Sequence, residues 1–197
     1  MRRALTLFSL ATMTAIAGCA APTPPVQVTR FHLGDPIARG EIAVEPRDRT
    51  QQQSLEFGRY AAIVRAELER AGFTAAADLA RSEQVAVIDV RRGSREEIAR
   101  RSGVSIGLGG GTFGSGVGVG GGVTIPIGRG RSREVVLTEL FVQLKRRSDG
   151  TISWEGRAQT EARDGTAYAA PEAAVTKLAQ ALFSGFPGES GRTITVR

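Results

Sequence analysis

The sequence is poor in the residues that metal binding and thiol chemistry use. Its 197 residues include one cysteine and one histidine. A lone cysteine excludes an internal disulfide. A lone histidine with no second cysteine and no cluster of acids at ligand spacing lacks the parts of a metal site. We therefore expect no metal, no cofactor and no catalytic cysteine.

Candidates for other catalysis are weak, and we assign no catalytic residue. His32 lies on an expected strand near the start of the domain, where a lone histidine is more often a surface or core side chain. Trp154 is expected as a core residue rather than a ligand platform. The scattered acids Asp35, Asp48, Asp78 and Asp89 are typical of turns and strand edges. A carboxylate pair that only the fold assembles, as in an envelope hydrolase, stays open as an alternative.

The chain also lacks a run of basic residues. Its formal charge is +6, but Arg2 and Arg3 belong to the leader described below, and the other arginines are interleaved with Asp and Glu. Lys145 and Lys177 are the only lysines. No nucleic-acid-binding motif or basic strand with interleaved aromatics accompanies the charge. We expect neither a nucleic acid nor a nucleotide as partner.

The N-terminal segment is typical of an export signal. Arg2 and Arg3 precede an uncharged apolar run from Ala4 to Ala17, which is shorter than the roughly 20 residues of a membrane span. At its end, Ile16, Ala17, Gly18 and Cys19 resemble the lipobox of bacterial lipoproteins. By this resemblance, residues 1–18 are a lipoprotein signal peptide and Cys19 is the lipidation site. A general secretory signal with an incidental cysteine is the alternative.

The resemblance implies a membrane location as well as a lipid anchor. The several acyl chains of a mature lipoprotein, palmitate among them, hold a protein firmly to a bilayer. Ala20, rather than Asp, follows the cysteine, which in the sorting pattern favours the outer membrane, facing the periplasm. Residues 19–25 then form the lipidated cysteine and a Pro-rich tether.

The rest of the chain predicts one α+β domain over residues 26–187. Residues 26–33 and 40–46 are short expected strands. From Ser54, a plausible N-cap, apolar residues recur at helical spacing and end at a glycine that can take a left-handed conformation. The predicted stripe consists of Phe57, Tyr60, Ala61, Val64, Leu68 and Ala71, with Arg59, Glu67 and Arg70 mostly outside it and Gly72 and Phe73 closing the helix.

The C-terminal half predicts a hairpin and a second helix. Residues 84–90 read as a central strand, and 91–102 as a loop or a frayed helical turn. Strands over 134–147 and 151–162 flank Asp149 and Gly150, a strong hairpin signal. A helix over 171–184 carries a buried stripe of Val175, Leu178, Ala179 and Leu182. We predict an antiparallel sheet with two helices packed on one face, followed by a tail, 188–197, whose end (192–197) is either an edge strand or loose.

A Gly-rich insert spans residues 103–128. Eleven of the twenty residues from Gly103 to Gly122 are glycine, and G-x-G-x-x-G occurs twice, but no helix pattern follows to meet a phosphate. Alternation instead places Val117, Val119, Val123, Ile125 and Ile127 on one face of an extended chain. The insert is either a β-hairpin that docks its aliphatic face on the domain or a partner, or a mobile loop.

Four features together resemble a known bacterial lipoprotein family, domain of unknown function 4136. They are the lipobox, the helix ending "LERAGF", the strand "ISWEGRAQTE" and the closing "FSGFP". The resemblance implies an α+β lipoprotein domain and brings no catalytic residues. We expect an outer-membrane-anchored envelope lipoprotein with a non-enzymatic binding or scaffolding role. An accessory subunit of a transport or secretion complex and a carboxylate-dependent hydrolase are the alternatives.

Overall fold

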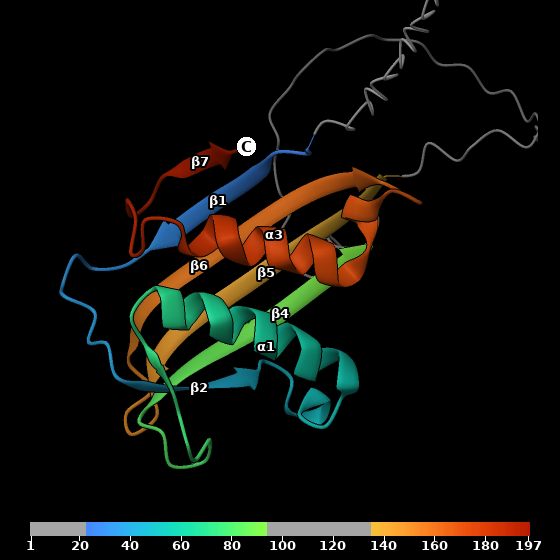
Figure 1. Cartoon of the computed structure of the whole chain (residues 1–197). Coiled ribbons are helices and arrows are strands. Elements are labelled where there is room, and N and C mark those ends of the chain that lie inside the picture. Colours follow the sequence, from blue (N-terminus) through green and yellow to red (C-terminus); the bar gives the residue numbers. More distant parts are fainter. Residues whose placement is uncertain (1–22, 94–134) are drawn as a thin grey trace, which may run out of the picture.

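The computed structural model describes residues 23–93 and 135–197 (Figure 1). The predicted signal peptide, the lipobox residues Ile16, Ala17 and Gly18, Cys19, and the Gly-rich insert at 103–128 lie outside the described residues.

Within the described residues, seven strands form one mixed sheet in the order β3-β2-β4-β5-β6-β1-β7. Their bounds are β1 (Val26–Phe31), β2 (Glu41–Pro46), β3 (Thr74–Ala75), β4 (Gln84–Gly93), β5 (Val135–Arg146), β6 (Ile152–Arg163) and β7 (Thr193–Val196). The α+β class is confirmed. The sheet is not wholly antiparallel as predicted, because β2 runs parallel to both β3 and β4. The chain leaves β2 through a helix and re-enters the sheet in the same direction, which is how parallel neighbours are joined.

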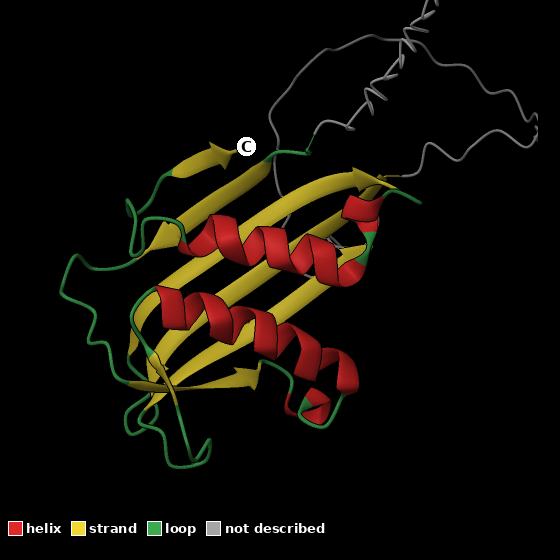
Figure 2. Ribbon diagram, viewed as in Figure 1, coloured by secondary structure: helices red, strands yellow, loops and turns green. Residues whose placement is uncertain are grey.

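The helices α1 (Leu55–Arg70) and α3 (Pro171–Phe183) lie side by side on one face of the sheet, as predicted (Figure 2). Short 3₁₀ turns, η1 (Arg49–Gln51) and η2 (Ala167–Ala169), precede them. The face opposite the helices is called the helix-free face below.

The ends of α1 follow from local sequence. The hydroxyl of Ser54 accepts a hydrogen bond from the N–H of Phe57, so Ser54 is the N-cap. At the other end, Gly72 has φ +97°, and the N–H of Phe73 donates to the carbonyl of Leu68 at 3.0 Å. This is the Schellman ending that the glycine predicted, and it returns Phe73 to the core beside Leu68.

The β5–β6 hairpin and α3 also match their sequence signals. Asp149 accepts a hydrogen bond from the N–H of Thr151, and Gly150 has φ +72°, as a tight turn requires. Pro171 occupies the first turn of α3. The predicted buried stripe is fully inside the protein: Val175, Leu178, Ala179 and Leu182.

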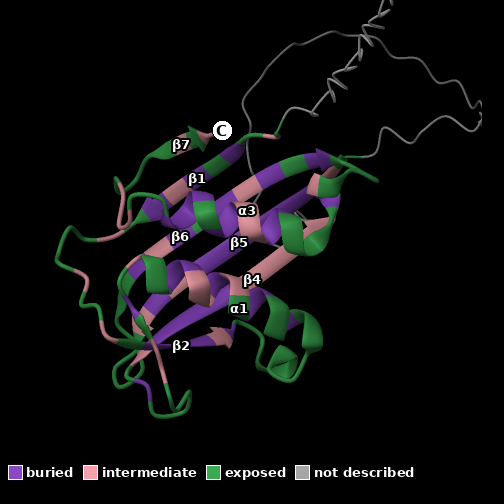
Figure 3. Cartoon of the chain, viewed as in Figure 1, coloured by how far each residue is buried: buried purple, intermediate pink, exposed green. Residues whose placement is uncertain are grey.

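The core fills the space between the sheet and the helices (Figure 3). Trp154 on β6 is completely buried, as expected, and its ring stacks on Phe183 at 5.6 Å. Its indole N–H donates to the carbonyl of Pro187 at 3.0 Å, so the buried polar atom is satisfied. Gly156, two residues along β6, leaves the room that the indole occupies.

Two predictions about polar residues were wrong. Glu67, expected mostly outside the helix stripe, is only 7% exposed, and its carboxylate pairs with Arg70. Arg91 was placed at the start of a loop or helical turn, but β4 continues to Gly93 in register with β5. Glu67 can be buried because the guanidinium of Arg70, one helical turn away, pairs with its carboxylate. Arg91 can continue β4 because β5 pairs with it as the neighbouring strand.

The C-terminal tail joins the sheet. Strand β7 pairs antiparallel with β1, with Val26 opposite Val196, so the tail is an edge strand rather than loose. Val26 also lies opposite Thr160 on β6, and Gly93 lies opposite Leu137 on β5. The starts of β1 and β5 and the ends of β4, β6 and β7 therefore share one end of the sheet, called the tether end below.

Candidate functional site

The best-supported site is the place where the chain enters the domain. Cys19 is outside the described residues, but Thr23, four positions later, is the first described residue. The Thr23 hydroxyl lies 3.1 Å from that of Tyr168, and the ammonium of Lys177 donates to the carbonyl of Pro24. Thr23 and Pro24, which belong to the predicted Pro-rich tether, therefore contact the domain.

A third contact extends this attachment into the sheet. The hydroxyl of Thr160 on β6 donates to the carbonyl of Pro25 at 2.8 Å, immediately before β1 begins. Fixed at Thr23, the chain has four residue steps to Cys19, which span at most about 14 Å when extended. The length of the chain therefore limits the distance between Thr23 and a group on Cys19 to about this value.

Lys177 on α3 is the central charge of this attachment. Its ammonium lies 5.4 Å from the centre of the Tyr168 ring, in a cation–π arrangement. Partial burial lowers the pKa of Lys177 from its usual value. No ion pair joins it to a carboxylate among residues 23–93 and 135–197. The cation is balanced there only by a carbonyl and an aromatic face.

Beside this attachment lies an open groove of about 570 Å³, called the tether groove below. It runs between the outer side of α3 and the edge strand β7, and Thr23 and Tyr168 also border it. The residues that matter below are Ala173, Thr176, Lys177, Ala181, Val196 and Arg197. Two of the α3 residues that line it, Ala173 and Ala181, have small side chains, and Val196 on β7 contributes an apolar one.

The helix-free face is a second surface with organised side chains. On β5, Phe141 lies between two guanidinium groups, those of Arg47 at 5.0 Å and Arg157 at 5.8 Å from its ring centre. Arg157 also lies 3.9 Å from the carboxylate of Glu139, which is 4% exposed. Arg91 pairs with Asp89 at 2.9 Å on β4.

Toward the β7 edge the helix-free face becomes mostly uncharged. The amide of Gln159 donates to that of Gln27 at 2.7 Å, and the hydroxyls of Thr29 and Thr193 lie 2.7 Å apart. We call this region the polar strip, and define it by cross-strand neighbours on β6, β1 and β7: Gln27, Thr29, Glu155, Arg157, Gln159, Thr193 and Thr195. Two of its side-chain pairs are joined by hydrogen bonds, Gln27 with Gln159 and Thr29 with Thr193.

The residues weighed for catalysis are separated. The Nε2 of His32 donates to the carbonyl of Gly188 at 3.0 Å, and its Nδ1 accepts from the N–H of Gly34 at 3.1 Å. Both ring nitrogens are thus used in fastening the loop after β1. Asp48 and Asp78 accept hydrogen bonds from nearby backbone N–H groups in turns, and Asp89 is paired on β4. Among the described residues, no three His, Cys, Asp or Glu side chains are grouped as metal ligands.

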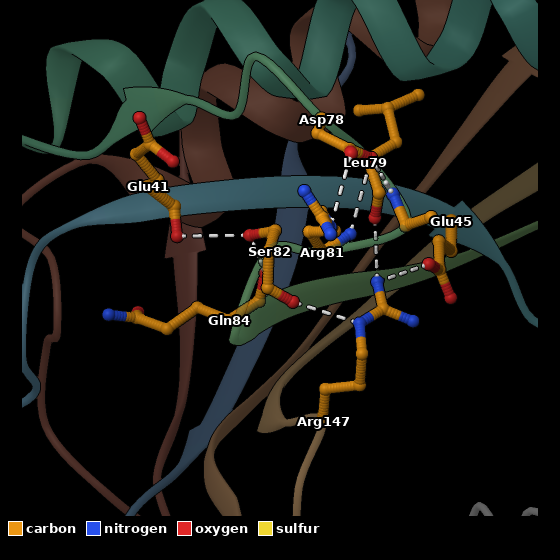
Figure 4. Close-up of polar contacts among 9 residues, drawn as sticks. Glu41, Glu45, Asp78, Leu79, Arg81, Ser82, Gln84 and Arg147 are labelled. Atoms are coloured by element: carbon orange, nitrogen blue, oxygen red, sulfur yellow. Dashed lines mark hydrogen bonds and ion pairs between the residues drawn. The ribbon is translucent and has the colours of Figure 1, made fainter.

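A denser polar cluster surrounds Arg147, and its partners show that it is structural (Figure 4). From just beyond β5, its guanidinium donates to the carbonyls of Ser82 and Leu79, each at 2.8 Å, and to the carboxylate of Glu45 at 2.6 Å. The hydroxyl of Ser82 in turn lies 2.7 Å from the carbonyl of Gln84. Arg147 thereby fastens the segment between β3 and β4 to β2.

Sequence reasoning did not find Lys177, Tyr168 or the tether groove. The only signal was that Lys177 is one of two lysines among many arginines, which by itself points to no site. None of the described helices is long and apolar enough to cross a bilayer.

Comparisons with known proteins place the chain in a family. The protein named "Uncharacterized protein ZMO1243", from Zymomonas mobilis subsp. mobilis, is 34% identical over 217 aligned positions, covering 89% of this chain and 81% of that protein. A solved PDZ domain protein from Parabacteroides distasonis aligns with TM-score 0.50 and 11% identity, over 88% of this chain and 39% of its own. A PelC dodecamer from Paraburkholderia phytofirmans aligns with TM-score 0.44 and 12% identity, over 84% and 99%.

The likeness to the PDZ domain protein concerns the fold alone, and this chain spans about two fifths of that chain's length. The family model named Domain of unknown function (DUF4136) matches residues 27–188, which is nearly the whole of the described fold. The protein therefore belongs to the DUF4136 family.

Proposed function

We propose that the protein is a lipoprotein of the outer membrane, anchored through Cys19 and facing the periplasm, with a non-enzymatic binding or scaffolding role. The observation that carries the proposal is the attachment at Thr23 and Pro24, which leaves four residue steps between the domain and Cys19. A lipid on Cys19 would hold the tether end within about 14 Å of the bilayer. The domain would then be held at the membrane surface, where it can bind other components of the envelope.

The lipobox residues Ile16, Ala17 and Gly18 support the anchor, and Ala20 supports the outer membrane as the address. The polar strip supports the binding role, because hydrogen bonds between Gln27 and Gln159 and between Thr29 and Thr193 order these side chains before any partner arrives. Since β1, β6 and β7 all extend from the tether end to the opposite end of the sheet, this strip would reach from the membrane side of the domain toward the periplasm.

Replacing Cys19 with Ser tests the anchor. We expect the wild-type protein in the outer-membrane fraction, with the added mass of a diacylglyceryl group and an N-acyl chain on Cys19 in its intact-mass spectrum. The Cys19→Ser variant should lack this mass. A wild-type protein that carries an unmodified Cys19 contradicts the proposal, whatever fraction it is found in.

Site-specific photo-crosslinking tests the binding role. A photoreactive residue at Glu155, in the polar strip, should give a discrete adduct with an envelope protein in intact cells. The same residue at Ala62, on the exposed side of α1, serves as the matched control and should give none. Equal adducts at both positions, or none at Glu155, would contradict a partner on this face.

A further inference from the structure

We propose that the tether groove binds a phospholipid, with an acyl chain lying along Val196 and the alanines of α3 and the phosphodiester at Lys177. The proposal deepens the lipoprotein assignment, on which it rests for the position of the groove beside a membrane.

The shape of the groove fits one acyl chain. Its volume of about 570 Å³ is within the range of about 300 to 1,000 Å³ typical of small-molecule sites. Ala173 and Ala181 line one side without filling it, and Val196, half-buried on the edge strand, lies along the other. The groove is open to solvent, so a chain can enter it from outside.

The charge of the groove fits a lipid phosphate. Lys177 is partly buried, is held by the carbonyl of Pro24 and the ring of Tyr168, and has no carboxylate partner among the described residues. A partly buried ammonium without a counter-ion favours an anion beside it. Arg197, the residue after β7, also borders the groove and carries a second cationic side chain. A phosphodiester carrying two acyl chains offers both the anion and the apolar part.

The position of the groove near the proposed anchor gives it access to membrane lipid. Thr23, which borders the groove, lies within about 14 Å of Cys19 along an extended chain. Tethering also raises the effective concentration of membrane lipid at the groove, to about the millimolar range for a short linker, so weak binding suffices for occupancy.

Native mass spectrometry of the full-length protein, purified in detergent and titrated with palmitoyl-oleoyl phosphatidylglycerol, tests the proposal. We expect a saturable adduct of one lipid per protein. Filling the groove with Thr176→Trp should weaken it at least tenfold, and Ala173→Trp, at an exposed position of α3, should act in the same way without disturbing the core. Ala62→Trp on α1 is the matched control and should bind as the wild type does.

Lys177→Gln tests the phosphate contact separately. It should weaken the phosphatidylglycerol adduct several-fold and leave the adduct of palmitoyl-oleoyl glycerol, which has the same chains and no phosphate, unchanged. Equal weakening of both lipids would contradict recognition of the phosphate. Adducts of the same strength in the wild type and both tryptophan variants, or no saturable adduct, would contradict the groove.

The same spectra separate this proposal from the anchor. A covalent lipid mass with no saturable phosphatidylglycerol adduct contradicts the groove and leaves the anchor standing. An unmodified Cys19 with a saturable adduct that Thr176→Trp removes contradicts the anchor and supports the groove.

Discussion

The guanidinium of Arg30 on β1 caps the carboxyl end of α3, where its Nε donates to the carbonyl of Leu182 at 2.9 Å. Its Nη2 donates to the carbonyls of Ala181 and Ser184, each also at 2.9 Å. Arg30 is 4% exposed, and burial lowers its pKa from the usual value. Carbonyls at a helix end have no partner within the helix and carry partial negative charge, so one buried cation satisfies several of them.

Replacing Arg30 with Met should therefore destabilise the protein by about 2 to 3 kcal/mol, because buried carbonyls of α3 lose charged hydrogen-bond donors. Arg30→Lys should recover only part of the loss, since an ammonium cannot reproduce the fork of a guanidinium. Urea unfolding followed by circular dichroism measures both. Arg59→Met is the control: Arg59 is exposed on α1, and its replacement should change stability by less than about 0.5 kcal/mol. Equal effects at positions 30 and 59 would contradict the cap.

Gly156→Ala should destabilise the protein through overpacking. A Cβ at this position would lie 2.3 Å from the Trp154 ring and 2.8 Å from the side chain of Leu182. Overpacking of this kind costs about 1 to 3 kcal/mol. Gly58→Ala is the matched control, because no atom lies within 4 Å of its added Cβ. In a helix that change should stabilise by about 0.5 to 1 kcal/mol, so thermal unfolding should shift in opposite directions for the two variants.

Tyr60 should give the protein a pH-dependent stability in alkali. Burial, with a hydrogen bond from its phenol to Glu56 at 2.6 Å, raises the pKa of Tyr60 well above its usual 10.0. The folded state then keeps a proton that the unfolded state releases, so stability falls as pH rises above about 10. Tyr60→Phe should lose less stability than the wild type over that range, measured by urea unfolding at pH 9 and pH 11. Parallel curves for the two proteins would show that Tyr60 does not carry the effect.

The proposed location in the outer membrane rests on Ala20. Ala20→Asp should move the lipidated protein from the outer to the inner membrane in a sucrose-gradient separation, because the sorting pattern retains proteins with Asp after the lipidated cysteine. Ala20→Ser should stay in the outer membrane. An Asp variant that still sediments with the outer membrane would contradict this address.

The sequence predicted elements whose determinants are local. Ser54 and Gly72 mark the ends of α1 through the hydrogen bonds and backbone angles that their own residue types allow. Asp149 and Gly150 likewise fix the β5–β6 turn, and Trp154 lies in the core as expected. In each case the partners lie within a few residues of one another.

Features that depend on distant partners were missed. Arg30 reads as one more polar residue in an alternating strand, and nothing nearby indicates that it meets a helix more than 150 residues later. The parallel pairing of β2 and β4 depends on the path of the helix between them. Lys177 and Pro24 meet for the same kind of reason, 153 residues apart, so the groove became visible only with the fold.

The place of β1 between β6 and β7 affects how the protein is made. The first strand of the domain has no partner until residues 152–163 are available, and its second partner consists of nearly the last residues of the chain. Contacts between such distant segments make folding slow. During synthesis, β1 can therefore complete its pairing only after almost the whole polypeptide has been made.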